Sequence, residues 1–303
     1  MKILLIYFSG TGNTKRITDL YVSAFEELDC EVSVAELPRD GADLKNADYV
    51  RSFDIIGIGY PIHAFNAPKI ILKACKALPR LDIKHGENKR VFIYKTSGEP
   101  VRMSDLSSLK MRKLLKKRGY AAEGEYQYVM PYNIIFRHSD TAAYKMWETA
   151  KALVPVDALE ITGGERHLPK NVIFGGFLAW VLRVEHPGAR LIGKFFKTTK
   201  DCTKCGLCIN ACPTKNIKIN KNGKVVFGGS CMMCMRCAFN CPHNAIKMGL
   251  FEGWKVNGKY SFAPPTDEGL PDKHAEYCIK AYNRYYENAQ KRLAEHNSDK
   301  PNE

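Results

Sequence analysis

Eight cysteines between residues 202 and 241 have the type and spacing that could hold inorganic redox centres. They form two runs, and in each run three cysteines at intervals of three residues precede a fourth cysteine that is followed by proline. The first run is Cys202, Cys205, Cys208 and Cys212, and the second is Cys231, Cys234, Cys237 and Cys241. Thiolates bind iron–sulfur clusters, while zinc sites and disulfides are the alternative uses of clustered cysteines. The repeated spacing, closed each time by proline, favours iron–sulfur clusters.

The two cysteine runs are also an internal repeat. A shift of 29 residues superposes all four cysteines and the proline, and it places Ile217 on Ile246 and Lys218 on Lys247. Residues 200–248 are therefore predicted to be a duplicated half-module with pseudo-twofold symmetry. Their apolar positions are too few for an ordinary core, so we expect the metal clusters to serve as the core of this segment.

The spacing Cys-x2-Cys-x2-Cys-x3-Cys-Pro resembles the motif of the bacterial two-cluster ferredoxins. In that family the fourth cysteine of each run binds the cluster of the other run. The resemblance implies two [4Fe–4S] clusters with crossed ligation. The first would be bound by Cys202, Cys205, Cys208 and Cys241, and the second by Cys231, Cys234, Cys237 and Cys212.

A glycine-rich loop near the start of the chain could bind a phosphate group. Residues 1–8 form a short apolar run, residues 9–14 read Ser-Gly-Thr-Gly-Asn-Thr, and residues 15–28 are predicted to be helical. The apolar run is too short for a signal peptide and lacks a cleavage site. A buried parallel strand followed by a phosphate loop and a helix N-terminus fits better. The loop matches neither the Walker A motif nor Gly-x-Gly-x-x-Gly.

Strand-like and helix-like segments alternate through the first half of the chain. Strands are predicted over residues 30–37, 53–59, 90–95 and 125–130, and helices over residues 67–78, 106–118 and 142–154. Such alternation predicts an α/β fold with a doubly wound parallel sheet. Ligands bind these sheets at the carboxyl ends of the strands, close to the point where the strand order reverses.

The loop at residues 9–14 resembles the FMN-phosphate loop of the flavodoxins. The resemblance implies that Ser9, Gly10, Thr11, Gly12, Asn13 and Thr14 hold the phosphate. It further implies that the flavin ring lies between Tyr60, Pro61, Ile62 and His63 on one side and Thr96, Ser97 and Gly98 on the other. Asn133 is expected at the same rim. Pro61 has no N–H, so a backbone bond to flavin N5 would have to come from Ile62, His63 or a later residue.

Together the two halves resemble the fused flavodoxin–ferredoxin proteins of anaerobic bacteria and archaea, over about residues 1–250. The expected organisation is a flavodoxin-like FMN domain at 1–165, an apolar interdomain segment at 166–198, a small α+β two-cluster ferredoxin domain at 199–250, and an extension with an amphipathic helix at 251–303. FMN exchanges one or two electrons, whereas each cluster exchanges one. The resemblance implies electron transfer between these cofactors and on to protein partners.

Two other functions agree with the same cofactors. One is a flavo-iron–sulfur reductase that acts on a quinone, a nitro compound or a flavin, and the other is a redox-sensing module. The sequence shows no acid–base constellation and no separate nucleotide-binding motif. No catalytic residue is therefore assigned, and the carrier function is favoured over an enzyme.

The charge of the chain is uneven and suggests the kind of partner. The net charge is +14; residues 1–160 carry 24 basic and 20 acidic residues, and residues 161–303 carry 22 and 12. A basic second half predicts acidic redox proteins as partners. No nucleic-acid-binding motif or basic tail is visible, so nucleic acid is not expected. Clusters of this type, without a signal peptide, predict a reducing cytoplasm. The oligomeric state is not predicted.

Helices are also predicted in two segments outside the motifs. Residues 171–182 are the most apolar stretch, but they fall short of the roughly 20 residues that span a membrane. They are predicted to form a helix buried between the two domains, and contact with a membrane surface is the alternative. Residues 273–296 are predicted to form an amphipathic helix that packs back onto either domain.

Overall fold

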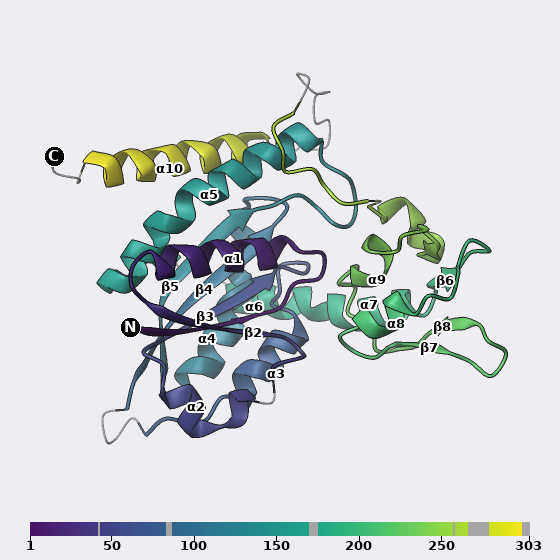
Figure 1. Cartoon of the computed structure of the whole chain (residues 1–303), viewed down its shortest axis with the longest axis horizontal. Helices are drawn as coiled ribbons and strands as arrows, with labels where there is room; N and C mark the ends of the chain where they lie inside the picture. The colour runs from purple at the N-terminus through teal and green to yellow at the C-terminus, as the bar shows by residue number, and fades with distance from the viewer. Residues whose placement is uncertain (42, 83–86, 170–174, 257, 266–278, 299–303) are drawn as a thin grey trace.

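The computed structural model of the chain describes residues 1–41, 43–82, 87–169, 175–256, 258–265 and 279–298. A parallel sheet flanked by helices occupies the first half of the chain, and a small domain of short strands and helices lies beside one end of that sheet (Figure 1). The predicted fold class is confirmed: a flavodoxin-like α/β sheet is followed by a small α+β domain.

The main sheet has five parallel strands in the order β2-β1-β3-β4-β5. They are β1 (Lys2–Tyr7), β2 (Glu31–Glu36), β3 (Ile55–Pro61), β4 (Lys89–Ser97) and β5 (Tyr120–Val129). Ile3 of β1 is in register with Val32 on one side and Ile55 on the other. The strand order reverses between β1 and β3, and this is the place where sheets of this order bind ligands.

Helices cover both faces of the sheet. One face carries α1 (Asn13–Glu26) and α5 (Asp140–Gly163), and the other carries α2 (Ala47–Arg51), α3 (Lys69–Ala77) and α4 (Leu109–Lys116) with the short 3₁₀ helices η1 (Asp43–Lys45) and η3 (Arg102–Ser108). The helix predicted over residues 106–118 is thus divided between η3 and α4. The helix predicted over 142–154 is α5, which is longer at both ends. Ser139 caps its start by accepting a hydrogen bond from the Ala142 N–H, and Gly164, with a φ of 83°, ends it.

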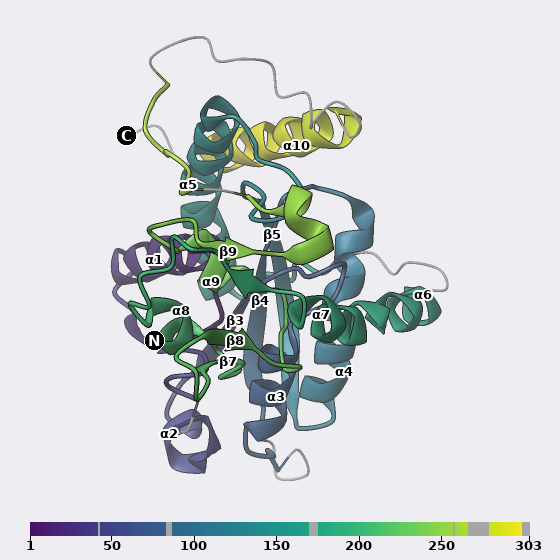
Figure 2. The ribbon, with the colours of Figure 1, turned by 90° about the vertical axis from the view of Figure 1, so that its right-hand side faces the viewer.

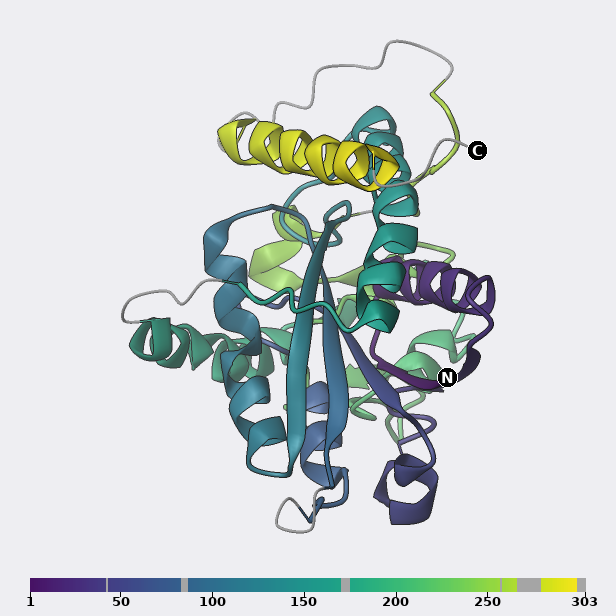
Figure 3. The ribbon, with the colours of Figure 1, turned by 90° about the vertical axis from the view of Figure 1, so that its left-hand side faces the viewer.

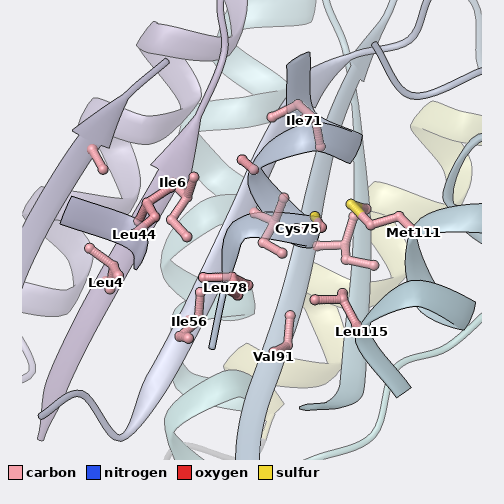
Figure 4. Packing of buried hydrophobic residues seen from close by; sticks show 14 of the residues in the cluster. Leu4, Ile6, Leu44, Ile56, Ile71, Cys75, Leu78, Val91, Met111 and Leu115 are labelled. Carbon is pink, nitrogen blue, oxygen red and sulfur yellow. The ribbon is translucent and has the colours of Figure 1, made fainter. Parts of the chain in front are cut away.

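The core follows from the alternation of side chains along buried parallel strands. On β1, Leu4 and Ile6 face the α3 and α4 layer, whereas Ile3, Leu5 and Tyr7 face α1 and α5. Figure 4 shows the first of these layers, in which sheet side chains pack against α3, α4 and η1. Its labelled members are Leu4, Ile6, Leu44, Ile56, Ile71, Cys75, Leu78, Val91, Met111 and Leu115.

The small domain has the predicted internal repeat. Its elements are β6 (Lys197–Thr198), α8 (Leu207–Ala211), β7 (Ile217–Ile219), β8 (Val225–Phe227), α9 (Arg236–Phe239) and β9 (Ile246–Lys247). β6 pairs with β9 and β7 with β8, both antiparallel. The 29-residue shift also relates three pairs of residues with positive φ, namely Lys204 and Met233, Gly206 and Met235, and Lys215 and Asn244. The repeat therefore holds at the level of the backbone.

The apolar segment between the domains is not buried as predicted. Its described part forms α6 (Gly175–Val181) and η4 (Leu182–Val184), while residues 171–174 lie outside the described residues. Phe177 and Trp180 are 67% and 63% exposed, and Figure 2 shows α6 projecting from the side of the molecule. The prediction fails because the main contacts of α6 among the described elements are with η3 and with the adjoining η4, at the edge of the fold. The following helix, α7 (Glu185–Gly193), is the one that lies between the domains.

The C-terminal extension returns to the first domain. After η5 (Gly249–Trp254), helix α10 (Ile279–Ser298) lies across α5, as Figure 3 shows. Tyr282 and Ala289 are its buried residues, and Arg292 pairs with the buried Asp157 of α5 at 2.6 Å. No helix among the described residues is both long enough and apolar enough to cross a membrane.

Candidate cofactor sites

The loop between β1 and α1 has the geometry of an anion-binding turn. Gly12 has a φ of 107°, which is unfavourable for other residues, and its N–H donates to Ser9 Oγ at 3.1 Å. Helix α1 begins at Asn13 and has no acidic residue in its first turn. The positive end of the helix dipole therefore meets no internal negative charge, which favours a bound anion.

Side-chain hydrogen bonds tie this loop to the ends of the neighbouring strands. Thr14 Oγ1 lies 2.9 Å from Thr96 Oγ1 at the end of β4, and both residues are buried. Beyond β5, Asn133 Nδ2 donates to Thr11 Oγ1 at 3.0 Å, and Asn13 Nδ2 donates to the Pro131 carbonyl at 2.8 Å. The loops after β1, β4 and β5 thus converge on one place.

These loops line a cavity of about 390 Å³, within the size range of small-molecule sites. The predicted flavin residues that line it are Ser9, Gly10, Thr11, Asn13, Thr14, Pro61, Ile62, His63, Thr96, Ser97 and Gly98. Gly12 lines the neighbouring cavity instead. Tyr60 does not line the cavity, because its side chain turns into the α3 and α4 layer, where its hydroxyl lies 3.0 Å from Ser107 Oγ.

The outer wall of this cavity comes from parts of the chain that the sequence motifs did not indicate. Helix α7 contributes Glu185, Gly188, Ala189 and Ile192, and the second cysteine run contributes Met232 and Met233. Ile134, Ile135 and Trp254 complete that wall. No local pattern marks these residues, because they reach the cavity only when the small domain packs against the sheet.

A tight turn holds His63 at the cavity. The backbone N–H groups of His63 and Asn66 donate to each other's carbonyls at 3.0 and 2.8 Å, and the two residues between them, Ala64 and Phe65, both have positive φ. Such φ values are rare outside glycine and asparagine, and strained backbone is common at functional sites. Asn66 Nδ2 also donates to the Leu182 carbonyl at 3.1 Å, which ties the turn to the segment before α7.

His63 faces a second titratable group across the cavity. Burial lowers the pKa of His63, the nearby Glu185 opposes this shift, and His186 reinforces it. The imidazole is therefore mainly uncharged near pH 7. His186 Nδ1 lies 2.9 Å from Glu185 Oε1. The sequence did not reveal this group of ionisable side chains, because His63 and Glu185 are more than a hundred residues apart.

The first cysteine trio and the last cysteine of the second run lie around a common cavity. Cys202, Cys205, Cys208 and Cys241 all line a space of about 360 Å³. Burial raises the pKa of the Cys208 thiol, and Cys202, Cys205 and Cys241 raise it further. The four thiols are therefore close enough to interact, as the crossed assignment expects, and Cys237 of the second run also lines this cavity.

The other four cysteines form the corresponding group. Cys212 lies beside the second trio, because the pKa of Cys237 is raised first by burial and then by Cys234, Cys231 and Cys212. Burial raises the pKa of Cys234 to about 12, so this thiol would release its proton on binding metal.

Backbone N–H groups approach the fourth cysteine of each run, Cys212 and Cys241, in the same way in both repeats. The Asn216 N–H donates to Cys212 Sγ at 3.3 Å, and the Ala245 N–H donates to Cys241 Sγ at 3.3 Å. Asn216 and Ala245 are related by the 29-residue shift. Hydrogen bonds to cysteine sulfur are one of the features that set the reduction potential of a cluster.

The donor sets fit polynuclear clusters. Each set contains four cysteines, as a [4Fe–4S] cluster requires, and all ten cysteines in the described part of the chain are free of disulfides. Across the described ranges, no three His, Cys, Asp or Glu side chains converge closely enough to hold a single metal ion.

The phosphate loop and the second cysteine group are in direct contact. A Cβ atom on Gly10 would lie only 2.3 Å from the Cys234 carbonyl oxygen, so the two backbones touch. Arg236 donates to the Ser9 carbonyl, and its Nη2 lies 3.3 Å from Glu36 Oε1. On the other side, a Cβ on Gly193 of α7 would lie 2.1 Å from Cys231 Cβ. Two cofactors in these sites would be neighbours.

Comparison with known proteins found one matching family model and several solved structures of similar fold. Residues 194–242 match the family model described as a 4Fe-4S dicluster domain. A flavodoxin from the domain Archaea is 15% identical, with 54% of this chain and 99% of that chain covered and a TM-score of 0.35. Flavodoxin 2 from Bacillus cereus is 20% identical, with 53% and 99% covered and a TM-score of 0.37. Rubredoxin oxygen:oxidoreductase from the anaerobe Desulfovibrio gigas is 14% identical, with 54% and 36% covered and a TM-score of 0.35.

A search of curated proteins found no match. The flavodoxin-like assignment of the sheet rests on its strand order, 2-1-3-4-5. The chain thus joins a flavodoxin-like domain to a ferredoxin-type 4Fe-4S domain, a combination that supports a role in electron transfer.

Proposed function

We propose that the protein carries electrons between one FMN, two [4Fe–4S] clusters and acidic redox proteins, in a reducing cytoplasm. The observation that carries this proposal is the contact between Gly10 of the phosphate loop and Cys234 of the second cysteine group. Met232 and Met233 of the same cysteine run line the flavin cavity. Direct packing of two redox sites in one chain supports transfer between them.

Each group of residues has a separate role in the proposal. Residues 9–14 would hold the FMN phosphate, residues 61–63 and 96–98 would hold the ring, and the two crossed cysteine sets would hold the clusters. FMN supplies the exchange between one-electron and two-electron chemistry. Cys234 is buried against the sheet domain, whereas Cys205 is exposed. The second cluster would therefore be the more buried one, packed against the sheet domain, and the first, whose cavity also borders the phosphate loop, would face external partners.

A second candidate function is the reduction of a small molecule at the flavin. The observation that favours it is the presence of two ionisable groups, His63 and Glu185, on the cavity wall. Such groups could exchange protons with a substrate that takes up two electrons. Rapid, saturable oxidation of the pre-reduced protein by a quinone or a nitro compound would favour this function over the carrier.

Cofactor analysis of protein made anaerobically with ample iron tests the proposal first. We expect about eight iron and about eight sulfide per chain, as two four-iron clusters require, together with about one FMN, the cofactor of the proposed flavodoxin-like site. EPR of the dithionite-reduced protein should show two interacting clusters. Zinc in place of iron, or purified protein that binds no flavin on addition of FMN, would contradict it.

Removal of two hydroxyl groups from the phosphate loop should weaken flavin binding. In the variant Thr11→Ala/Thr14→Ala, each lost donor to a phosphate dianion is worth about 1.5–3 kcal/mol. We expect the FMN dissociation constant to rise at least tenfold, by fluorescence titration, with unchanged EPR signals of the clusters.

Thr18→Ala is the matched control for that variant. Its hydroxyl is also buried on α1 and bonds to the Thr14 carbonyl and the Tyr94 hydroxyl, but Thr18 does not line the cavity. It should lower stability and leave flavin affinity unchanged. Equal flavin affinity in the double variant and in wild type would place the phosphate elsewhere.

A further inference from the structure

The small domain is far more basic than the rest of the chain. Residues 194–248 contain ten lysines and arginines but a single acidic residue, Asp201. Several of these lysines lie on the β7–β8 hairpin and on the cysteine loop before α8. Figure 1 shows this hairpin at the end of the small domain that points away from the parallel sheet.

Three lysines meet at the hairpin turn. The turn is closed by the Gly223 N–H, which donates to the Asn220 carbonyl at 2.9 Å, and it carries Lys221 and Lys224. Lys204 comes from the cysteine loop, and its Nζ lies 3.6 Å from the position of a Cβ on Gly223. We call Lys204, Lys221, Lys224 and the adjacent Leu207 the lysine face.

These lysines are exposed and lack internal counter-charges. None of the three forms an ion pair with any residue that the structure describes, whereas Arg236 in the same domain pairs with Glu36, and Lys255 just beyond it pairs with Glu252. Clustered like charges repel one another and raise the local positive potential. An acidic partner would offset that repulsion and would be drawn to this end of the molecule.

One side of the lysine face borders a candidate cofactor site. Lys204, Cys205 and Leu207 all line the cavity of the first cysteine group. Cys205 is exposed and Leu207 is 54% exposed, whereas Cys234 of the second group is buried. A partner that docks here would contact the edge of the first site without any movement of the sheet domain.

We infer that the lysine face docks an acidic protein that carries one electron, with Leu207 as the apolar centre of the contact. This inference rests on the proposed function. In each encounter the partner's reduced centre loses one electron and the cluster held by Cys202, Cys205, Cys208 and Cys241 gains one, with no bond made and no proton required. Transfer in the opposite direction uses the same contact.

Charge reversal tests the inference with a control of identical net charge. The test variant is Lys204→Glu/Lys221→Glu/Lys224→Glu. The control is Lys113→Glu/Lys116→Glu/Lys117→Glu in the last turn and C-cap of α4, where all three lysines are exposed and none forms an ion pair within the described ranges. Stopped-flow mixing with a dithionite-free, pre-reduced acidic two-cluster ferredoxin measures the bimolecular rate constant at rising salt.

We expect the test variant to react at least tenfold more slowly at low salt and to lose most of its salt dependence, since steering accelerates association by roughly 10- to 1,000-fold. The control should stay within about twofold of wild type, because its charges lie outside the encounter surface. An equal loss in both variants would show that only net charge matters, and no loss in either would place docking elsewhere; both results overturn the inference.

The experiment separates this inference from the proposed function. EPR spectra, flavin content and reduction by dithionite are recorded for all three proteins. Absence of clusters or flavin in wild type would refute the proposed function itself. Fully loaded wild-type protein that dithionite reduces but the acidic ferredoxin does not would refute only the docking inference.

Discussion

Gly10→Ala is expected to damage the flavin site and the second cysteine group together. The new Cβ would lie 2.3 Å from the Cys234 carbonyl oxygen. The position of a Cβ is fixed by its own backbone and the carbonyl is part of the backbone, so no change of rotamer can relieve this contact. We expect flavin affinity to fall more than tenfold, which is about 1.4 kcal/mol or more. The EPR signal of the second cluster should change in the same protein.

Two other glycine variants show whether the effect of Gly10→Ala comes from this contact. Gly163→Ala adds the same atom in α5 with no atom within 4 Å, so both cofactor sites should be unaffected. Gly193→Ala would bring a Cβ within 2.1 Å of Cys231 Cβ without touching the phosphate loop, so it should alter mainly the second cluster. Normal flavin affinity and a normal EPR spectrum in Gly10→Ala would mean that the two domains do not pack in this way.

Cys241→Ala should remove the cluster of the first run, and Cys212→Ala that of the second. The structure places Cys241 with Cys202, Cys205 and Cys208 around one cavity, although Cys241 belongs to the other repeat. Loss of one thiolate ligand should reduce the iron content from about eight to about four per chain, because we propose a four-iron cluster for each site. Anaerobic iron assay and EPR of the reduced protein measure this directly.

Crossed ligation is tested by finding which cluster each cysteine variant loses. Selective labelling of the trio left without its cluster, by alkylation and mass spectrometry, identifies it. If Cys241→Ala exposed Cys231, Cys234 and Cys237 to alkylation, ligation would be uncrossed and the assignment wrong. Cys75→Ala is the control, because Cys75 is buried in the sheet core and belongs to neither group; both clusters should survive.

Local patterns in the sequence were sufficient for the fold class and for the repeat. Strand β1 and the loop after it were predictable, because an apolar run followed by Ser-Gly-Thr-Gly-Asn-Thr is typical of a buried strand, a turn and the start of a helix. The repeat was predictable for the same reason, since its spacing lies within short runs. The end of α5 was missed, because its last turns are stabilised by packing against α1 and α10 and not by any local signal.

The placement of the apolar segment and of Tyr60 depended on tertiary structure. Hydrophobicity alone predicted that residues 171–182 would be buried, yet α6 exposes Phe177 and Trp180, and α7 takes the place between the domains. Tyr60 is adjacent in sequence to three residues that line the cavity, but the alternation of β3 turns its side chain into the core. The hydrophobic pattern did not show that α6 would stay exposed, and the resemblance did not show which side chains at the end of β3 face the cavity.

The sequence by itself determined the two kinds of candidate site: thiols at cluster spacing, and a glycine-rich loop after a strand. Only the tertiary structure decided that these sites touch, through Gly10 and Cys234, and that α7 and two methionines close the flavin cavity. The reason is physical. A metal-binding or phosphate-binding motif consists of a few residues that are close together in the sequence. Contact between residues more than two hundred positions apart depends instead on how two complete domains pack.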